Sequence, residues 1–303
     1  MGCPCKKQAR QFIIKTMKIL VTGAHGQLGH DVMKELEKRG HEAFGPSSRE
    51  LDITDAGSVN RVLNHFMPDA VIHCAGWTAV DDAEKAENRE RVFAINRDGS
   101  ANLAAFCAGT GAKMLYISTD YVFDGNGTEP WQPDCKDYAP ISVYGQSKLE
   151  GELAVASALE RYFIVRIAWL FGINGKNFVK TMLNAGRTHD SVRVVCDQIG
   201  TPTYAADLAR LLADMIESER YGYYHATNEG GFISWYDFTK EIYSLAGLDT
   251  QVIPVTTAEY GSPAKRPFNS RLDKSKLKAN GFEPLPDWKD ALSRYLKELE
   301  NNG

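Results

Sequence analysis

The sequence predicts an α/β protein with a Rossmann-like, doubly wound parallel sheet and a smaller, irregular C-terminal substrate lobe. Short apolar segments alternate with segments of helical periodicity from residue 17 onwards, which is typical of a parallel sheet covered by helices on both faces. A glycine-rich turn directly follows the first apolar segment. Beyond residue 172 the alternation weakens and prolines become frequent, which indicates a less regular region.

The expected elements follow from hydrophobic periodicity and from turn and capping signals. Strands are expected at 18–22, 41–44, 70–74, 113–118 and 162–168. Helices are expected between them at 30–39, 58–66, 88–108 and 145–159. After residue 172, helices are expected at 178–185 and 205–217 and an extended segment at 192–195.

These elements divide the chain into three expected parts. Residues 1–16 are basic and precede a second possible start at Met17, so we expect a disordered leader there. Residues 17–171 form the expected dinucleotide-binding domain. Residues 172–303 form mainly a substrate-binding lobe, with 205–225 as a candidate to return to the sheet.

Composition excludes several classes of protein. The 303 residues carry 35 basic and 39 acidic side chains, and so small a bias argues against a general nucleic-acid binder. No apolar run is long enough to span a bilayer, so no membrane association is expected. The six cysteines lack paired zinc spacing, and together with the size of the chain they suggest a reducing, cytoplasmic setting.

A phosphate loop is predicted at the end of the first strand. Gly23, Gly26 and Gly29 are spaced G-x-x-G-x-x-G, with His25 inside the turn. Glycines at this spacing permit a tight turn, close approach of a pyrophosphate and close packing of the following helix. The free N–H groups at the helix start then hold the anion. We therefore expect a dinucleotide cofactor here.

The second strand indicates which dinucleotide. It lacks the terminal acidic residue that binds both ribose hydroxyls of NAD. Instead it runs into Ser47, Ser48 and Arg49, which could accept a 2′-phosphate, although Arg49 equally suits a solvated surface charge. This favours NADP(H) and leaves NAD(H) as the alternative.

Tyr144 and Lys148 form the predicted catalytic pair. They lie four residues apart at the start of an expected helix, so the phenol and the ammonium share one helix face. A nearby ammonium favours the phenolate, which would make Tyr144 able to give a proton to a carbonyl oxygen. Thr119 ends the fourth strand at the carboxyl edge of the sheet, where such sheets bind ligands, and could hydrogen-bond the substrate or Tyr144.

In this order, the glycine-rich loop, the Ser-Thr-Asp segment and the Tyr-x-x-x-Lys pair resemble the extended short-chain dehydrogenases/reductases. Five longer motifs are similar to the dTDP-4-dehydrorhamnose reductases within that group: Glu50–Thr54, Thr78–Glu84, Ser118–Gly125, Gly175–Val179 and Arg266–Asp273. The resemblance covers the chain from Met17 nearly to its end. It implies NAD(P)H-dependent reduction of the 4-keto group of a dTDP-linked sugar, dTDP-4-dehydro-6-deoxy-L-mannose.

The resemblance also implies roles for individual residues. Thr119, Tyr144 and Lys148 would form the catalytic triad, with Tyr144 as proton donor, and all three groups would also meet substrate or cofactor. The expected cofactor contacts are Gly23, His25, Gly26, Gln27, Leu28, Arg49, Asp52, Ile53, Ala75, Gly76, Trp77, Thr78 and Asn96. Further substrate contacts are expected from Asp120, Trp169, Asn177 and Arg266.

Several alternatives remain open at this point. Asn96 equally suits a helix bend, and Trp169 equally suits packing between lobes. A nucleotide-sugar epimerase or dehydratase would use the same tyrosine and lysine, and a non-catalytic relative that binds methionine adenosyltransferase keeps the same fold. No metal-ligand cluster is predicted, although a divalent ion at Glu298–Glu300 is an alternative to a solvated helix face. The chain is expected to be a monomer or a homodimer.

Overall fold

The computed structural model describes residues 16–301 and contains a six-stranded parallel sheet. Its strands are β1 (Lys18–Thr22), β2 (Glu42–Phe44), β3 (Ala70–His73), β4 (Lys113–Thr119), β5 (Tyr162–Ile167) and β10 (Gly222–His225). Their order across the sheet is β10-β5-β4-β3-β1-β2. The chain reverses direction across the sheet between β1 and β3, which leaves a crevice at their carboxyl ends. The predicted fold class is confirmed.

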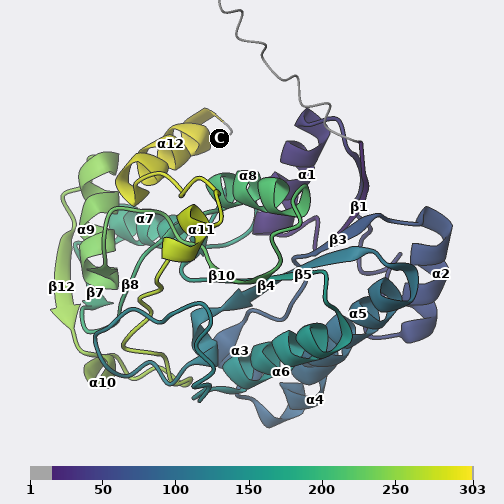
Figure 1. Ribbon diagram of the computed structural model, residues 1–303. Helices are drawn as coiled ribbons and strands as arrows, with labels where there is room; N and C mark the ends of the chain where they lie inside the picture. Colours follow the sequence, from purple (N-terminus) through teal and green to yellow (C-terminus); the bar gives the residue numbers. More distant parts are fainter. Residues whose placement is uncertain (1–15, 302–303) are drawn as a thin grey trace, which may run out of the picture.

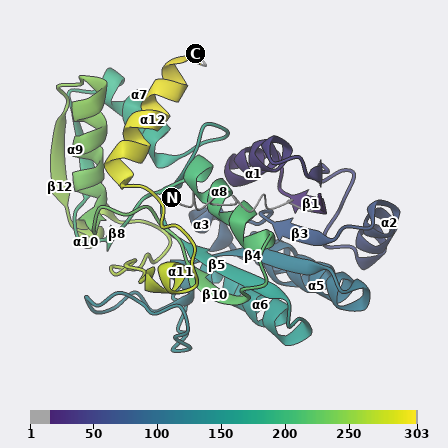
Figure 2. The same cartoon turned by 45° about the horizontal axis from the view of Figure 1, so that its top comes forward.

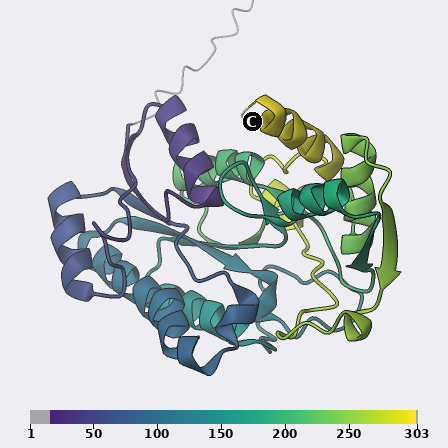
Figure 3. The ribbon, with the colours of Figure 1, turned by 180° about the vertical axis from the view of Figure 1, so that it is seen from behind.

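Two helix layers cover the sheet (Figure 1). One face carries α1 (Gln27–Lys38) and α8 (Ala205–Ile216), whose apolar residues form a core with the sheet. The other face carries α2 (Ala56–Phe66), α5 (Gly99–Thr110) and α6 (Val143–Ala158). Viewed from behind, the same two layers flank the sheet (Figure 3). Burial on both faces explains why the middle residues of β1, β3 and β4 are apolar.

Local capping determines where the important helices begin. Asp55 caps α2 by accepting from the Gly57 N–H at 2.8 Å, and Ser142 caps α6 by accepting from the Gly145 N–H at 3.1 Å. Such caps satisfy N–H groups that have no partner within the helix. The α6 cap places Tyr144 in the first turn of that helix, beside the end of β4.

The long helix expected over 88–108 is interrupted. It consists of the 3₁₀ turn η1 (Ala86–Asn88), α4 (Arg89–Phe93), the π-helical segment η2 (Ala94–Asp98) and α5. The short α3 (Val80–Ala83) precedes it, and the 3₁₀ turn η3 (Asp120–Val122) follows β4. Asn96 therefore lies in the π-helical segment, which agrees with the bend that the sequence left open.

The C-terminal elements gather at one end of the sheet (Figure 2). Helices α7 (Phe178–Thr188), α9 (Trp235–Ala246) and α12 (Trp288–Asn301) enclose a separate apolar core. Short strands join them: β6 (Leu170–Phe171), β7 (Ser191–Val195), β8 (Ile199–Gly200), β9 (Thr203–Tyr204), β11 (Ile233–Ser234) and β12 (Gln251–Val255). The remaining helices are α10 (Thr257–Tyr260) and α11 (Ser275–Ala279). The sequence did not predict α9 or α12.

Segment 205–225 contributes α8 to one helix layer and β10 to the sheet edge, where Tyr224 is in register with Val165 of β5. The first 15 residues, for which we expected a disordered leader, lie outside the described part of the chain. Within residues 16–301, no helix has the length and apolar character needed to cross a membrane.

Candidate active site

The predicted phosphate loop forms a tight turn between β1 and α1. Gly23 has a φ of +68°, and a Cβ atom there would lie 2.7 Å from the Ala75 nitrogen. A Cβ on Gly29 would lie only 2.1 Å from the Gly23 carbonyl oxygen. Side chains at these two positions would therefore force the backbone apart, and the absence of side chains leaves the start of α1 open to a ligand.

A cleft of about 540 Å³ lies in front of this turn. Of the predicted cofactor residues, it is lined by Gly23, His25, Gly26, Asp52, Ile53 and Ala75. Arg49 is exposed and is not among the lining residues. Arg91 of α4 does line the cleft, although sequence reasoning did not select it. The spacing of Arg91 within the expected helix gave no sign that this exposed side chain would border the cleft.

Ser47 lines the same cleft and is hydrogen-bonded to Glu50. Its N–H and its hydroxyl both donate to one Glu50 carboxylate oxygen at 2.8 Å. These bonds hold the pKa of Glu50 below its ordinary value. The cleft thus combines Ser47, Ser48 and Arg91 with two nearby carboxylates, those of Glu50 and Asp52.

Asn96 joins the segment after β3 to the catalytic helix. Its side-chain oxygen accepts from the Trp77 N–H at 2.7 Å, while its amide donates to the Trp77 carbonyl at 3.1 Å and to the Ser147 hydroxyl at 2.9 Å. A Cβ on Gly76 would lie 3.2 Å from the Asn96 oxygen and 3.8 Å from Lys148 Nζ. Gly76 and Trp77 therefore lie close to Lys148, whereas Thr78 is exposed.

The three predicted catalytic residues come together at the carboxyl end of β4. Thr119 is the last residue of β4, and its hydroxyl hydrogen-bonds Tyr144 in the first turn of α6. Lys148, one turn further along α6, donates to the Ile117 carbonyl at 2.7 Å and lies 4.0 Å from the centre of the Tyr116 ring. A phenol, an ammonium and a hydroxyl thus surround one point beside the cofactor cleft.

Burial perturbs the pKa of each of these groups. It raises the pKa of Tyr144 to about 12, with the Thr119 hydrogen bond acting in the opposite direction. It lowers the pKa of Lys148 to about 7, and the nearby Glu152 carboxylate partly offsets that effect. It raises the pKa of Asp120 to about 6, against hydrogen bonds from Ser270 and Thr119. Perturbed groups at a ligand-binding edge indicate a catalytic site.

A buried ion pair supports the catalytic helix from behind. Arg166 of β5 donates to both Glu152 oxygens, at 2.8 and 2.7 Å, and neither side chain is exposed to solvent. Arg166 also donates to the Pro133 carbonyl and to the Tyr138 hydroxyl. The pair therefore ties α6 to β5 and to the loop that follows η3.

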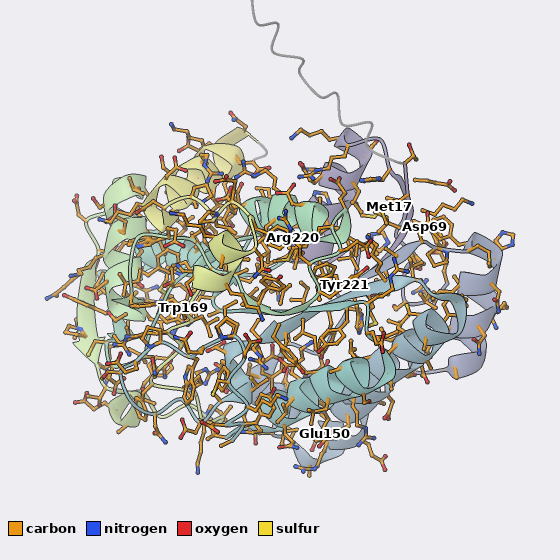
Figure 4. The ribbon with its side chains drawn as sticks, in the orientation of Figure 1. Met17, Asp69, Glu150, Trp169, Arg220 and Tyr221 are labelled. Atoms are coloured by element: carbon orange, nitrogen blue, oxygen red, sulfur yellow. The ribbon has the colours of Figure 1, made fainter. Side chains whose placement is uncertain are left out.

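Trp169 lies just beyond the end of β5, on the side of the C-terminal lobe and far from Met17 and Asp69 at the amino ends of the strands (Figure 4). Its φ of +53° is unusual for a residue with a side chain and is often found at functional sites. One face of its ring stacks on Trp235, with centroids 3.8 Å apart. Phe171, two residues further along the chain, is buried in the lobe core.

Two of the predicted substrate contacts, Asn177 and Arg266, have very different surroundings. Asn177 caps α7: its oxygen accepts from the Lys180 N–H, while its amide donates to Gln27, Gly172 and Tyr295. Its side-chain oxygen and nitrogen are thus already bound to protein groups. Arg266 is one-quarter exposed and forms an ion pair with Asp81 at 2.7 Å.

Two further predicted cofactor residues, Leu28 and Gln27, contact other protein groups. Leu28 is buried in the core below the phosphate loop, and Gln27 contacts Asn177. No group of three or more potential metal ligands occurs among residues 16–301. Glu298, considered above for a divalent ion, accepts a hydrogen bond from the Tyr204 hydroxyl.

Comparison with known proteins gives consistent results along the whole described chain. Residues 17–301 match the family model described as the RmlD substrate binding domain. The dTDP-4-dehydrorhamnose reductase of Streptomyces griseus is 42% identical, and the match covers 92% of this chain and 93% of the relative.

Two crystal structures of dTDP-4-dehydrorhamnose reductases are also similar. The protein from Clostridium acetobutylicum has a TM-score of 0.90 and 45% identity, covering 94% of this chain and 100% of its own. The protein from Bacillus anthracis, crystallised in complex with NADP, has a TM-score of 0.89 and 41% identity, covering 93% and 99%.

Proposed function

Because this chain belongs to the RmlD substrate binding domain family, we propose that it reduces the 4-keto group of dTDP-4-dehydro-6-deoxy-L-mannose to give dTDP-L-rhamnose. The observation that carries this proposal is the meeting of Thr119, Tyr144 and Lys148 at the carboxyl edge of the sheet, beside the cleft of the phosphate loop. This arrangement suits proton donation to a carbonyl oxygen.

The described residues fit a nicotinamide dinucleotide. Gly23 and Gly29 leave space that a Cβ would fill, and the start of α1 faces the cleft, so Gly26 and its neighbours would hold the pyrophosphate. The cofactor, when bound, supplies the hydride to the carbonyl carbon. Asp52 and Ile53 would flank the adenine, and Gly76, Trp77 and Lys148 would lie at the nicotinamide end.

NADP(H) is the proposed preference. Ser47, Ser48 and Arg91 supply hydroxyl and guanidinium donors for a 2′-phosphate, and Arg91 takes the role that the sequence suggested for Arg49. Glu50 opposes this preference, because its carboxylate repels phosphate. Arg91→Gln should therefore reduce kcat/KM with NADPH about tenfold or more and leave that with NADH nearly unchanged, since a charged hydrogen bond contributes about 1.5–3 kcal/mol. Arg49→Gln is the matched control. Equal losses with both cofactors would contradict the assignment.

In the reaction, Tyr144 donates its phenolic proton to the sugar oxygen as that oxygen becomes negative. Thr119 would hold the carbonyl group, and the Lys148 ammonium would stabilise the phenolate that remains. The closeness of Lys148 to Gly76 also lets it bind the nicotinamide ribose.

The dTDP group would bind towards the C-terminal lobe. Arg266 has a planar guanidinium that can hold phosphate oxygens through two hydrogen bonds, and Asp81 keeps it in position. Trp169 and Asp120 are the proposed sugar contacts. In this scheme residues 17–171, with α8 and β10, bind the cofactor, and the rest of 172–303 binds the substrate.

A spectrophotometric assay tests the proposal. Oxidation of NADPH should depend on dTDP-4-dehydro-6-deoxy-L-mannose, and the free keto sugar should have a far lower kcat/KM, because binding energy from the remote diphosphate positions the ketone. Comparable kcat/KM for the free sugar would instead indicate a general ketone reductase. Cofactor binding without any turnover would indicate a non-catalytic relative. Epimerisation without net NADPH oxidation would indicate an epimerase.

A further inference from the structure

The segment 172–177 begins the C-terminal lobe and lies against the phosphate loop. The amide of Asn174 donates to the His25 carbonyl oxygen at 2.7 Å and to the Gly26 carbonyl oxygen at 3.4 Å. His25 and Gly26 line the cofactor cleft, whereas Asn174 is not among the lining residues. The two loop carbonyls therefore face the C-terminal lobe rather than the cleft.

This segment is held in place by bonds that do not involve the Asn174 side chain. The Lys180 ammonium donates to the Ile173 carbonyl oxygen at 2.6 Å and to the Gly175 carbonyl oxygen at 3.0 Å, on either side of Asn174. Gly175 has a φ of +74°, which a residue without a Cβ adopts freely. The backbone thus presents the Asn174 amide to the phosphate loop from a fixed position.

The peptide between His25 and Gly26 is bonded on both of its sides. Asn174 binds its carbonyl oxygen, and the Gly26 N–H donates to the Gly23 carbonyl oxygen at 2.9 Å. In a planar trans peptide these two groups point in opposite directions. Because Gly26 has no Cβ, this peptide can turn at low steric cost. A turned peptide would direct its carbonyl dipole into the cleft and repel a pyrophosphate.

The start of α1 depends on the loop backbone more than other helix starts do. The first N–H groups of a helix have no partner within it, and Gly26, the residue that caps α1, has no side chain to bind them. Helices α2, α6, α7 and α9 instead have side-chain caps, which are Asp55, Ser142, Asn177 and Ser234. At α1 the direction of the free N–H groups therefore follows from how the preceding carbonyls are held.

We propose that Asn174 is a positioning residue for the cofactor: by binding the carbonyls of His25 and Gly26, it keeps the N–H groups at the start of α1 directed at the pyrophosphate. The C-terminal lobe, to which the proposed function assigns the substrate, thus also shapes the cofactor site. The inference rests on the proposed function only in placing a nicotinamide dinucleotide at the phosphate loop.

Binding measurements without any sugar test the role of Asn174. Isothermal titration calorimetry would compare NADP⁺ binding to the full chain and to Asn174→Ala. The variant should bind NADP⁺ about three- to tenfold more weakly, the net effect of losing one hydrogen bond. Adenosine 2′-monophosphate, which lacks the pyrophosphate, should bind equally to both proteins. An unchanged NADP⁺ affinity, or an equal loss for both ligands, would overturn the proposal.

Two further variants separate the hydrogen bonds from packing. Asn174→Asp keeps the size of the side chain, but an ionised carboxylate can only accept hydrogen bonds, so NADP⁺ should bind at least as weakly as to Asn174→Ala. Asn184→Ala is the matched control, because Asn184 is an exposed asparagine of α7 in the same lobe, and it should bind NADP⁺ normally. Normal NADP⁺ binding by Asn174→Asp, or an equal loss in Asn184→Ala, would contradict the role of the Asn174 amide.

The two proposals fail separately. If NADP⁺ binding responds to Asn174→Ala as expected but the full chain does not turn over the dTDP sugar, only the proposed function is contradicted. If turnover is normal and Asn174→Ala keeps its NADP⁺ affinity, only the role of Asn174 is contradicted.

Discussion

The cofactor cleft and the catalytic edge lie side by side on one sheet but are built differently. The cleft depends on backbone: Gly23 and Gly29 leave space for a close turn, and its lining offers few fixed side-chain contacts. The catalytic edge depends on buried side chains, with Thr119, Asp120 and Tyr144 linked to each other and Glu152 paired to Arg166. Substitutions that add atoms to the glycines should therefore disturb the cleft most. Substitutions that remove or alter side chains should disturb the catalytic edge most.

The largest expected effect is loss of the Tyr144 proton. Tyr144→Phe should reduce kcat by about 10²–10⁴-fold, the usual contribution of a positioned proton donor, with little change in cofactor affinity. Single-turnover reduction and cofactor fluorescence titration would measure the two quantities. Tyr121→Phe is the control: it removes the hydroxyl of a neighbouring tyrosine, whose ring centre lies 5.4 Å from that of Tyr144. Near-normal turnover of Tyr144→Phe would contradict the assignment of Tyr144 as the proton donor.

The next effect concerns stability. Glu152→Ala should reduce the free energy of unfolding by about 3–5 kcal/mol, because it leaves the Arg166 guanidinium buried without its partner. The control lies on the outer side of the same helix, where Glu150 (labelled in Figure 4) pairs with Arg97 at 3.3 Å in partial contact with solvent. Glu150→Ala should cost less than about 1 kcal/mol. Chemical denaturation would compare them, and equal losses would contradict the importance of burial.

The cleft should respond to a single added methyl group. Gly29→Ala should destabilise the chain by about 3 kcal/mol, near the upper end for overpacking, because the new atom meets the Gly23 carbonyl rather than a movable side chain. Cofactor affinity should fall as well. Gly26→Ala, with a nearest contact of 3.2 Å, should have a smaller effect on stability, and Gly109→Ala, with open space around it, should be neutral. If Gly109→Ala cost as much as Gly29→Ala, the steric explanation would fail.

The smallest expected effect concerns a buried side chain in α1, the helix that begins at the phosphate loop. Two residues after Gly29, α1 buries the Asp31 carboxyl, whose pKa is raised from 3.8 to about 6 by burial and then by the Glu298 carboxylate. Because the folded pKa lies above the unfolded one, the carboxyl favours folding below about pH 4 and this contribution is lost as the pH rises through 6.

Asp31→Asn should therefore raise the free energy of unfolding by about 1 kcal/mol above pH 7 and by nearly nothing below pH 4. Thermal unfolding at a series of pH values would measure this. A benefit that is the same at both ends of the pH range would show that ionisation of Asp31 is not the cause.

The same contrast explains what could be predicted from the sequence. Glycine spacing after β1 and the apolar strands depend on local pattern, and β1 and β3 were placed within one residue. Arg91 lies in α4, before the π-helical segment η2, and its local spacing did not indicate that it would line the cleft. Asn177 was predicted as a substrate contact, and its amide bonds to Gln27 and Tyr295 come from segments far apart in the chain that local sequence patterns do not bring together. Helix α9 does carry a local signal that was overlooked, because Ser234 and Asp237 form a capping box at its start and Gly247 ends it.

The π-helical segment η2 has a consequence for how such proteins change over time. A π turn holds one residue more than the α turn that it replaces, and here that residue count lets Asn96 reach both Trp77 and Ser147. Deletion of one residue from 94–98 would allow a regular α-helix and yet turn Asn96 away from them. A change in chain length at this position would therefore alter the surroundings of the active site even where Asn96 itself is kept.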